Sequence, residues 1–567
     1  MNTWKLRILA LVLAMTCLLG LSACAASDEG TTASPDGQTS SDDASATQSG
    51  TDAEEAPDPF GKYEEPITIN VVRILDSTTK FDENYPETKS LEDNIWSHAY
   101  EDMLGIKLNY LWTPSGTEYP TKWNMAMISG DLPDMGVVDA ATYLKLVEGG
   151  LVEDMTDYFD QYASDYYKAQ VEAENGISVD YMTFDGRMLG LPITGATPDS
   201  ANFLFVRQDW LDAVGMEAPT TIDELMEVAQ AFKDAQLGGP DTYGICMGPY
   251  EFSGDCDWEG FLNGYGAYYN LWLEGGDGKL AYSNTLPEMR EAILGMKELY
   301  DRGLISQEFA INGSITEDLV AGKVGICYGT YWAPIMSIQN QMNSDPDSKW
   351  IALELPTVDG SPAKTQAWGS GAPSSFFFVR KGYEHPEAAV KLINLGFKLD
   401  VEDPMTYNFH EESQIQVHAY RIAAPWEPWR NVNNNILVWD ALESGDTSAL
   451  SANNMDMYNN IIKYREGTLE REKQGYMLVN ETEGSTYAII NKMKNEDRIV
   501  LDQYRTLPTP QFSEQLTVLM NDLYQVMVQV ITGDDISEFD KAVEKWYADG
   551  GEALTQEVNE WYAASKS

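Results

Sequence analysis

Aromatic residues in polar loops are the part of this sequence whose types and spacing could do chemistry. Tryptophan and tyrosine occur 15 and 31 times, and several lie beside Gly, Pro, Asn or Asp. Sugar rings stack their C–H faces on aromatic planes while their hydroxyl groups need short polar partners, so such loops favour carbohydrate binding. The four clearest stretches are CDWEGFLNGYGAYYNLW (256–272), YGTYWAPI (328–335), QAWGSGAP (366–373) and APWEPWRNVNNN (424–435).

Core packing is the alternative interpretation for any single tryptophan, because large aromatic side chains are mostly buried. Trp210, Trp546 and Trp561 fall at amphipathic helical positions, and we assign them to the core.

Signatures of catalysis are weak. Gly369-Ser370-Gly371 lacks the spacing of a nucleophile elbow, and Ala321-Gly322-Lys323 is followed by Val, so it is not a phosphate loop. A pair of acidic groups of the glycosidase type stays open, because their separation of about 5–10 Å is a distance in space. The histidines show no zinc-ligand spacing and are expected at the surface or in helix caps: His98, His385, His410 and His418.

The N-terminus has the pattern of an export signal. The first seven residues carry two positive charges, Lys5 and Arg7, and 6–19 is almost entirely apolar. This run is shorter than the roughly 20 residues that span a bilayer. Leu21-Ser22-Ala23-Cys24 matches a bacterial lipobox, so we predict a signal peptide over 1–23 and a diacylglyceryl group on Cys24, with no other cofactor. An ordinary signal peptide with an incidental cysteine is the alternative.

The segment from 24 to 62 is predicted to be a disordered tether. Ser, Thr, Ala, Gly and Asp dominate it, and Phe60 is its one large apolar side chain. Such a segment buries too little surface to offset the entropy of ordering. The mature chain is therefore expected on the extracellular side of a membrane, held there by lipid.

Composition narrows the partners of the body. The net charge is −53, from 90 acidic and 37 basic residues, which argues against nucleic acid. It also disfavours strongly anionic glycans, unless a local basic cleft forms near Arg207, Arg421 or Arg430. About five hundred residues are too many for one core and natural for two lobes.

The body shows an α/β pattern. Residues 66–75 read as a strand, 91–104 as a helix and 106–112 as a second strand. Amphipathic helices are expected over 221–235 and 286–303, and the region from 513 to 562 is expected to be mostly helical. The cysteines of the body, Cys246, Cys256 and Cys327, are expected to be small buried apolar residues, with a Cys246–Cys256 bridge left open.

Together these stretches resemble the lipid-anchored extracellular solute-binding proteins of bacterial ABC importers, of the large oligosaccharide-binding type (family 1). The matching stretches lie in the expected order over nearly the whole body. They are ISGDLPDMGVVDA (128–140), YMTFDGRMLGLPIT (181–194), LFVRQDWLDAVGMEAPTTIDELMEVAQAFKDA (204–235), DTYGI (241–245), AGKVGICYGTYW (321–332), RKGYEHPEAAVKLIN (380–394) and FDKAVEKWYADGGEALTQEVNEWY (539–562).

The resemblance implies an α/β, periplasmic-binding-protein-like fold, with two lobes of largely parallel sheets joined by a hinge and a helical C-terminus. The body, 63–567, would divide into lobe 1, roughly 63–190 plus 370–450, and lobe 2, roughly 191–369 plus 451–567. Such a protein is not an enzyme: it closes on an oligosaccharide and delivers it, as a monomer, to the membrane subunits of an ABC permease.

The resemblance also implies ligand-binding positions. The loop after the GVVD strand contributes polar contacts in relatives, here Asp139, Ala140 and Thr142. In YGTYW the aromatic after the strand aligns with a sugar-stacking tryptophan of maltose-binding-type proteins, here Trp332 with Tyr331 beside it.

Further candidates rest on loop context alone. Trp368, Trp426 and Trp429 are aromatic residues in polar loops. Arg207 is a candidate ligand contact, with a structural role as the alternative, since its motif also opens the helix that follows.

One departure from the family concerns metal. Many relatives have a calcium-binding loop before DTYG, where this chain has AQLGG (235–239) between Asp234 and Asp241. Two carboxylates would make a poor cage for a cation that takes six to eight oxygens, so we predict no metal there.

Three other functions stay open at this stage. They are a peptide-binding ABC lipoprotein, a surface-anchored glycan-cleaving enzyme, and a binding module for a sensor kinase or adhesin.

Overall fold

The computed structural model describes residues 57–75, 79–114, 116–195, 200–249, 254–311, 315–367, 373–410, 412–481 and 484–566. The predicted signal peptide, Cys24 and most of the predicted tether lie outside these residues, as does Trp368. In the described part of the chain, every helix is too short or too polar to cross a bilayer.

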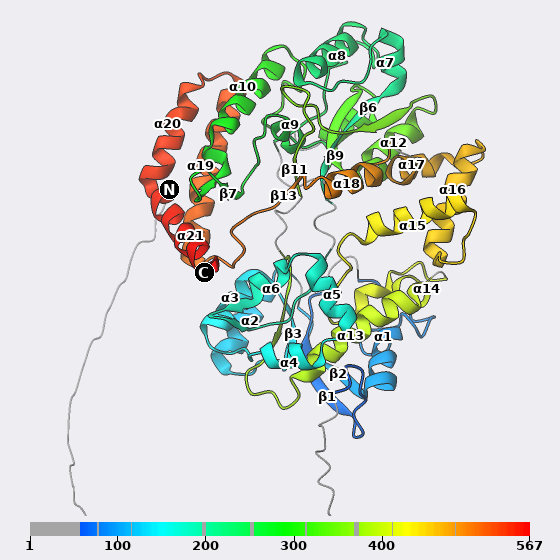
Figure 1. The fold of residues 1–567 in the computed structure, drawn as a ribbon, viewed down its shortest axis with the longest axis vertical. Coiled ribbons are helices and arrows are strands. Elements are labelled where there is room, and N and C mark those ends of the chain that lie inside the picture. Colours follow the sequence, from blue (N-terminus) through cyan, green and yellow to red (C-terminus); the bar gives the residue numbers. More distant parts are fainter. Residues whose placement is uncertain are drawn as a thin grey trace, which may run out of the picture. The chain divides into compact units, whose positions relative to one another are not determined.

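A first hydrophobic core is formed by two separate stretches of chain, 69–191 and 376–423. Its strands β1, β2 and β3 lie together, with helices around them (Figure 1). The elements are β1 (Ile67–Val72), α1 (Ile95–Ala99), η1 (Tyr100–Leu104), β2 (Ile106–Trp112), α2 (Tyr119–Ser129), β3 (Met135–Val138), α3 (Ala140–Glu148), α4 (Thr156–Tyr162), α5 (Asp165–Ala173), α6 (Ile177–Met182), β4 (Thr183–Phe184), β5 (Arg187–Met188), β12 (Phe376–Val379), α13 (Glu387–Glu402), α14 (Pro404–Asn408) and η6 (Val417–Tyr420).

The predicted strand–helix–strand unit is confirmed. β1 and β2 run parallel, with Ile67 opposite Ile106, and the β-branched residues of β1 explain its extended backbone. The left-handed Gly105, with φ of 69°, ends the helical segment directly before β2.

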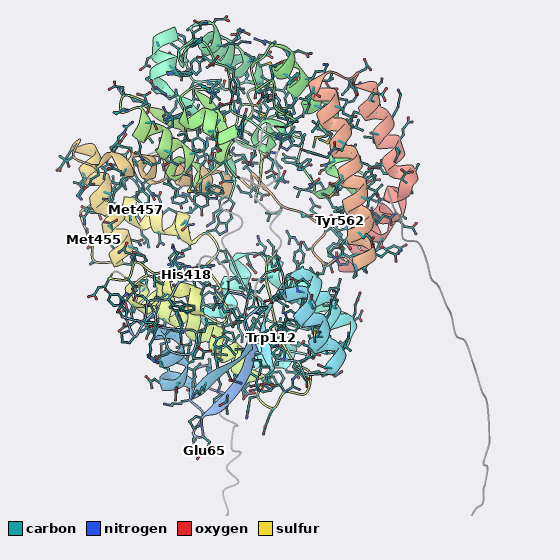
Figure 2. All side chains as sticks on the ribbon, turned by 180° about the vertical axis from the view of Figure 1, so that it is seen from behind. Glu65, Trp112, His418, Met455, Met457 and Tyr562 are labelled. Carbon is teal, nitrogen blue, oxygen red and sulfur yellow. The ribbon has the colours of Figure 1, made fainter. Side chains whose placement is uncertain are left out.

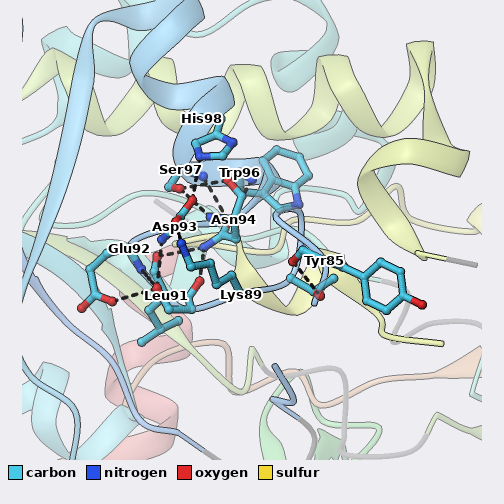
Figure 3. A network of polar contacts seen from close by, with 11 residues as sticks. Tyr85, Lys89, Leu91, Glu92, Asp93, Asn94, Trp96, Ser97 and His98 are labelled. Atoms are coloured by element: carbon cyan, nitrogen blue, oxygen red, sulfur yellow. Dashed lines mark hydrogen bonds and ion pairs between the residues drawn. The ribbon is translucent and has the colours of Figure 1, made fainter. Parts of the chain in front are cut away.

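Helix α1 begins at a dense cap (Figure 3). The Asn94 side chain accepts hydrogen bonds from the backbone N–H groups of Trp96 and Ser97, and the Ser97 hydroxyl oxygen accepts one from the Asn94 N–H. Asn94 also donates to the carbonyl oxygens of Ser90 and Leu91. His98 lies beside Asp93 at the surface, as expected for a surface histidine.

A three-stranded sheet, β10–β6–β9, separates two further cores. Along β6, Leu204 and Val206 face the second core, whereas Phe203 and Phe205 face the third, because successive side chains of a strand point to opposite faces. Both faces of this sheet are therefore covered, which explains why all six residues of β6 are buried.

The elements of this second part, also drawn in Figure 1, begin at β6. They are β6 (Asn202–Arg207), α7 (Gln208–Val214), α8 (Ile222–Asp234), α9 (Glu259–Gly264), β7 (Trp272–Glu274), β8 (Leu280–Tyr282), η3 (Ser283–Thr285), α10 (Pro287–Asp301), α11 (Ile315–Val320), β9 (Ile326–Thr330), η4 (Ala333–Ile335), α12 (Ser337–Ser344), β10 (Trp350–Leu353), β11 (Thr365–Gln366), α15 (Arg430–Ser444), α16 (Ala452–Arg465), η7 (Arg471–Lys473), α17 (Gln474–Asn480), α18 (Thr486–Asn495), β13 (Ile499–Val500), α19 (Pro510–Thr532), α20 (Ser537–Trp546), η8 (Tyr547–Gly551) and α21 (Glu552–Ser565).

The expected helices are confirmed here. The helix predicted over 221–235 is α8, which opens with a capping box between Thr221 and Glu224, and the one predicted over 286–303 is α10. The C-terminus is helical from α19 to α21. Trp210 and Trp546 are buried, and the half-buried Trp561 packs against the second core.

The expectation of largely parallel sheets is wrong in detail. Strands β1 and β2 are parallel, as are β11 and β13, but β6 pairs antiparallel with both β9 and β10, and β12 pairs antiparallel with β3. The reason is topological, since the chain leaves the first core after Leu191 and re-enters it with β12, which returns along β3 in the opposite direction.

A pocket at the ends of the strands

A pocket of about 340 Å³ lies where β1 and β3 end and where β12 begins. We call it the strand-end pocket. Ligands of α/β proteins commonly bind at the carboxyl ends of strands, and this volume falls within the usual range for a small ligand. The lining residues are Val72, Arg73, Ile74, Tyr110, Tyr119, Val137, Val138, Asp139, Ile193, Ser374, Ser375, Arg421, Ile422, Ala423 and Ala424.

Asp139 lines this pocket and also caps helix α3. Its carboxylate accepts a hydrogen bond of 2.7 Å from the Thr142 backbone N–H, while its own N–H donates to the Tyr119 hydroxyl at 3.4 Å. Thr142 is buried behind this cap and Ala140 is exposed. Burial and the nearby carboxylate raise the pKa of Tyr119 to about 12, so its hydroxyl stays protonated as a donor.

Two arginines meet at the other side of the pocket. Arg73 directly follows β1 and donates from Nη1 to the Arg421 carbonyl oxygen at 2.9 Å, and from Nη2 to that of Ala419. The Arg421 side chain is only 2% exposed, and its Nη1 and Nη2 atoms have no hydrogen-bond partner. Burial lowers the pKa of this guanidinium.

Trp426 lies in the segment of the chain that leaves the strand-end pocket. Its ring lies 4.6 Å from the Arg421 guanidinium and 4.7 Å from that of Arg430. Thr194 fixes its backbone, with hydrogen bonds of 2.8 Å to the Trp426 N–H and 2.7 Å to its carbonyl oxygen. His418, labelled in Figure 2, packs edge-on against the same ring at 5.2 Å between centroids.

Tyr331 and Trp429 lie on the third-core side, and Trp332 directly follows Tyr331 in the chain. Tyr331 and Trp429 pack at the margin of that core, and Asn431 contacts the Tyr331 hydroxyl at 3.4 Å. Trp332 follows β9 and lies directly over Gly254, where an added Cβ would come within 2.2 Å of the indole. The segment from Arg421 to Asn431 therefore joins this aromatic group to the strand-end pocket.

Arg207 lies elsewhere. It ends β6, whereas Tyr331 and Trp332 follow the strand β9, whose Thr330 pairs with Asn202 at the opposite end of β6. Arg207 is 3% exposed and ion-paired with Asp209 at 2.5 Å and Asp345 at 3.0 Å. Of its two proposed roles, this geometry favours the structural one.

The sequence does not predict that Arg73 contacts Arg421, although it makes Arg421 a candidate for a local basic cleft. The available signal for Arg73 is its position: it is the charged residue that immediately follows a β-branched strand, and strand ends carry binding groups in α/β folds.

A larger hollow of about 690 Å³ runs along β10 and α17, beside Gln208, Trp350 and Arg471. None of the predicted ligand-binding residues lines it, so we base the candidate site on the strand-end pocket.

Several titratable side chains outside the strand-end pocket are buried within the protein. Cys246, Cys256 and Cys327 are free thiols buried in the third core, as expected for small apolar residues, so the bridge that was left open does not form. Glu174 is buried between α5 and α6, where burial raises its pKa to about 7. No described cluster of three or more His, Cys, Asp or Glu side chains is placed to hold a metal ion.

The loop at 235–239 is occupied by local contacts. Asp234 accepts a hydrogen bond from Gln230 at 2.9 Å, and the Gly238 N–H donates to the Thr242 hydroxyl at 2.9 Å. A Cβ at Gly238 would lie 2.2 Å from the Gly322 carbonyl oxygen, so the backbone is closely packed there.

Comparison with known proteins identifies the class. The family model described as bacterial extracellular solute-binding protein matches residues 86–397, and the chain belongs to that family. The predicted resemblance is thus confirmed.

Individual relatives extend the match beyond that region. Lipoprotein LipO of Bacillus subtilis (strain 168) is 26% identical over 481 residues, which cover 82% of this chain and 88% of LipO. The polygalacturonan/rhamnogalacturonan-binding protein YtcQ of the same strain is 24% identical over 485 residues, covering 82% and 87%.

The fold is shared with solved structures. An extracellular solute-binding protein from Bifidobacterium longum subsp. infantis superposes with a TM-score of 0.58 at 16% identity, covering 88% of this chain and 98% of that protein. The expected periplasmic-binding-protein-like fold is therefore confirmed.

Proposed function

We propose that this protein is the membrane-anchored, extracellular substrate-binding component of an ABC transporter, which captures an oligosaccharide by lobe closure and delivers it to the permease. The observation that carries the proposal is the strand-end pocket, whose polar and aromatic lining joins the aromatic group at Trp332 through the segment 421–431. The relative YtcQ, named for binding polygalacturonan and rhamnogalacturonan, supports a saccharide as the ligand.

The ligand-binding residues of this proposal divide into two groups. Asp139, with Tyr119, would meet hydroxyl groups of the ligand in the strand-end pocket. Trp332 and Tyr331 would stack on sugar rings from the third-core side, and Trp429 would support them. Trp368 remains a candidate on sequence alone, and Thr142 would act by holding Asp139.

For the lobes, we propose that 57–191 and 376–423 form one and that the rest of the body forms the other. The separate cores support this division. The last crossing then falls at 424–431, earlier than the residue 450 expected from sequence, because Val432 packs with the third core. The chain would also cross after Leu191 and before Phe376.

The anchor belongs to the same proposal. Cys24 would be lipidated after removal of 1–23, and two or three acyl chains, at about 0.8 kcal/mol per buried CH₂, would hold the protein at the membrane. The relative named lipoprotein LipO supports this. We also propose that the protein acts as a monomer, without catalysis, and hands its ligand to permease subunits.

Titration calorimetry against a panel of oligosaccharides and peptides tests the function. We expect saccharide binding with no product released. Binding of peptides in place of saccharides would refute the ligand class, and cleavage of a bound saccharide would refute the transport role.

A further inference from the structure

A second hollow lies along helix α2, outside the strand-end pocket. Its volume is about 530 Å³, and we call it the α2 groove. None of the ligand-binding residues of the proposed function lines it. The residues that matter for its chemistry are Trp112, Thr121, Lys122, Met125, Ser129 and Asp131.

Strand β2 places the α2 groove next to the strand-end pocket. Near its end, Tyr110 and Trp112 both pack against the first core, whereas Leu111 between them is exposed. Tyr110 lines the strand-end pocket and Trp112 lines the α2 groove. Trp112 is also paired with Val72, another residue of the strand-end pocket, and paired strands lie about 4.8 Å apart. The two hollows are therefore neighbours.

The Trp112 indole is held in place and is still accessible from the groove. It is half-buried, and its ring lies 5.4 Å from that of Trp123 at an angle of 79° between the planes (Trp112 is labelled in Figure 2). The buried Trp123 in turn packs edge-on against Phe378 of β12 at 5.6 Å between centroids. Because the core already orders this ring, a ligand that contacts it has little side-chain freedom to freeze.

The other side chains of the groove combine apolar and polar surface. Met125 is 65% exposed and adds an apolar contact beside the indole. Thr121 and Ser129 contribute hydroxyl groups, Lys122 an ammonium group and Asp131 a carboxylate, all on exposed residues. An indole surrounded by short polar groups suits a sugar ring, whose C–H face stacks on the aromatic plane while its hydroxyl groups form hydrogen bonds.

We propose that the α2 groove is a second sugar-binding site, in which Trp112 stacks on a ring of the same oligosaccharide that occupies the strand-end pocket. The ligand is then a chain of several rings that extends from one hollow into the other. This inference rests on the proposed function and specifies the length of its ligand.

A series of chain lengths tests the inference on the unchanged protein. Titration calorimetry would compare malto-, cello-, xylo- and galacturono-oligosaccharides of one to six rings. For the type of saccharide that binds, we expect affinity to rise about 10-fold at the length whose added ring reaches Trp112.

The outcomes separate the two proposals. Binding of a saccharide with an affinity that does not rise with chain length would overturn the inference and leave the proposed function intact. Failure of every saccharide to bind would overturn both.

Variants locate the contact. Trp112→Leu keeps an apolar side chain against Trp123 but removes the aromatic plane, so it should lose the 10-fold gain for long chains and change little for short ones. Trp112→Tyr should keep most of the gain. Trp439→Leu is the matched control, because Trp439 is also half-buried and lies outside both hollows.

A second variant covers a failure to fold. If Trp112→Leu is unfolded by circular dichroism, Thr121→Met replaces it, since its longer side chain at an exposed position would obstruct the groove. A folded variant that keeps the full gain with chain length would refute the assignment. Loss of uptake by cells with unchanged calorimetry would also refute it, because the groove would then contact the permease instead of the ligand.

Discussion

At the scale of single residues, neighbouring side chains hold both the ring and the backbone of Trp426 in place. Two guanidinium groups lie within 5 Å of its ring, at 4.6 and 4.7 Å, and its backbone N–H and carbonyl oxygen are both hydrogen-bonded to Thr194. Such cation–π contacts are worth about 0.5–2 kcal/mol each, so the indole orients Arg421 and Arg430.

Replacing Trp426 with Ala should weaken saccharide binding by about 10-fold, because the indole packs on Arg421 and so supports the segment that lines the strand-end pocket. Calorimetry measures the change. The matched control is Trp439→Ala, since Trp439 also lies under an arginine, Arg465 at 5.0 Å, but outside the pocket. Equal losses in the two variants would contradict a specific role for Trp426.

We expect Glu174 to make the free energy of unfolding depend on pH. Burial raises its pKa to about 7, above the ordinary value of 4.5, and its Oε1 accepts hydrogen bonds from the Ser178 N–H and hydroxyl. The folded state thus holds the proton more tightly than the unfolded state. The associated stability is fully present below about pH 4.5 and is lost as pH rises towards 7, by up to about 3 kcal/mol.

The variant Glu174→Gln removes this titration and should flatten that part of the pH profile. Urea unfolding of both proteins between pH 4.5 and pH 7.5 gives the difference in stability, which cancels the effect of the other carboxylates. A difference that does not change with pH would show that Glu174 is not held protonated.

At the scale of elements, the first turn of α1 affects the candidate site from a distance. Its cap fixes Trp96, which is fully buried and lies 5.2 Å from the Arg421 guanidinium. The strength of the cap comes from one side chain, because Asn94 both accepts from the helix and donates to the preceding loop.

We expect Asn94→Ala to lower the free energy of unfolding by about 2 kcal/mol, from the lost cap and the loop carbonyls left without a donor. Asn340→Ala, the same change at an exposed position in α12, should be nearly neutral. Urea unfolding followed by tryptophan fluorescence checks both. Similar midpoints for the two variants would show that the cap contributes little.

The loop at 235–239 leads to a prediction about metal. Its backbone is packed on Gly322, and Asp234 is bonded to Gln230, so few oxygens are free for a cation. Neither added calcium nor EDTA should shift the melting temperature, and the purified protein should contain no stoichiometric calcium by elemental analysis. A calcium-dependent rise in melting temperature would contradict this.

How far sequence predicts these elements depends on the range of their interactions. Helix α8 was foreseen because its capping box and apolar face lie within one short stretch. The antiparallel direction of β12 was not predicted, because its partner β3 lies in a distant part of the chain. The same holds for Arg421, whose indole neighbour Trp96 comes from another element. Sequence placed Asp139 at a strand end but could not show that its carboxylate is shared with a helix cap.

At the scale of the whole molecule, the body and the N-terminal segment would have separate tasks in the proposed function. The cores of the body lie between residues 69 and 558, and the predicted lipid would attach at Cys24. Binding and anchoring can thus be tested independently.

Cys24→Ala should release the protein from the membrane into the medium, whereas its ligand affinity should not change. Cys17→Ala is the matched control, because Cys17 lies within the predicted signal peptide, 1–23. Fractionation of cells, followed by immunoblotting, measures the distribution. Retention of the Cys24→Ala protein at the membrane would refute lipidation at this cysteine.

The return of β12 to β3 also sets the order in which the protein can mature. The first core needs residues as late as Ala423, so its sheet cannot be completed while the ribosome is still making the segment 201–363. An N-terminal portion that emerges early has no finished core to collapse around. We therefore expect such a portion to stay unfolded while the rest of the chain is made, which would suit the proposed export.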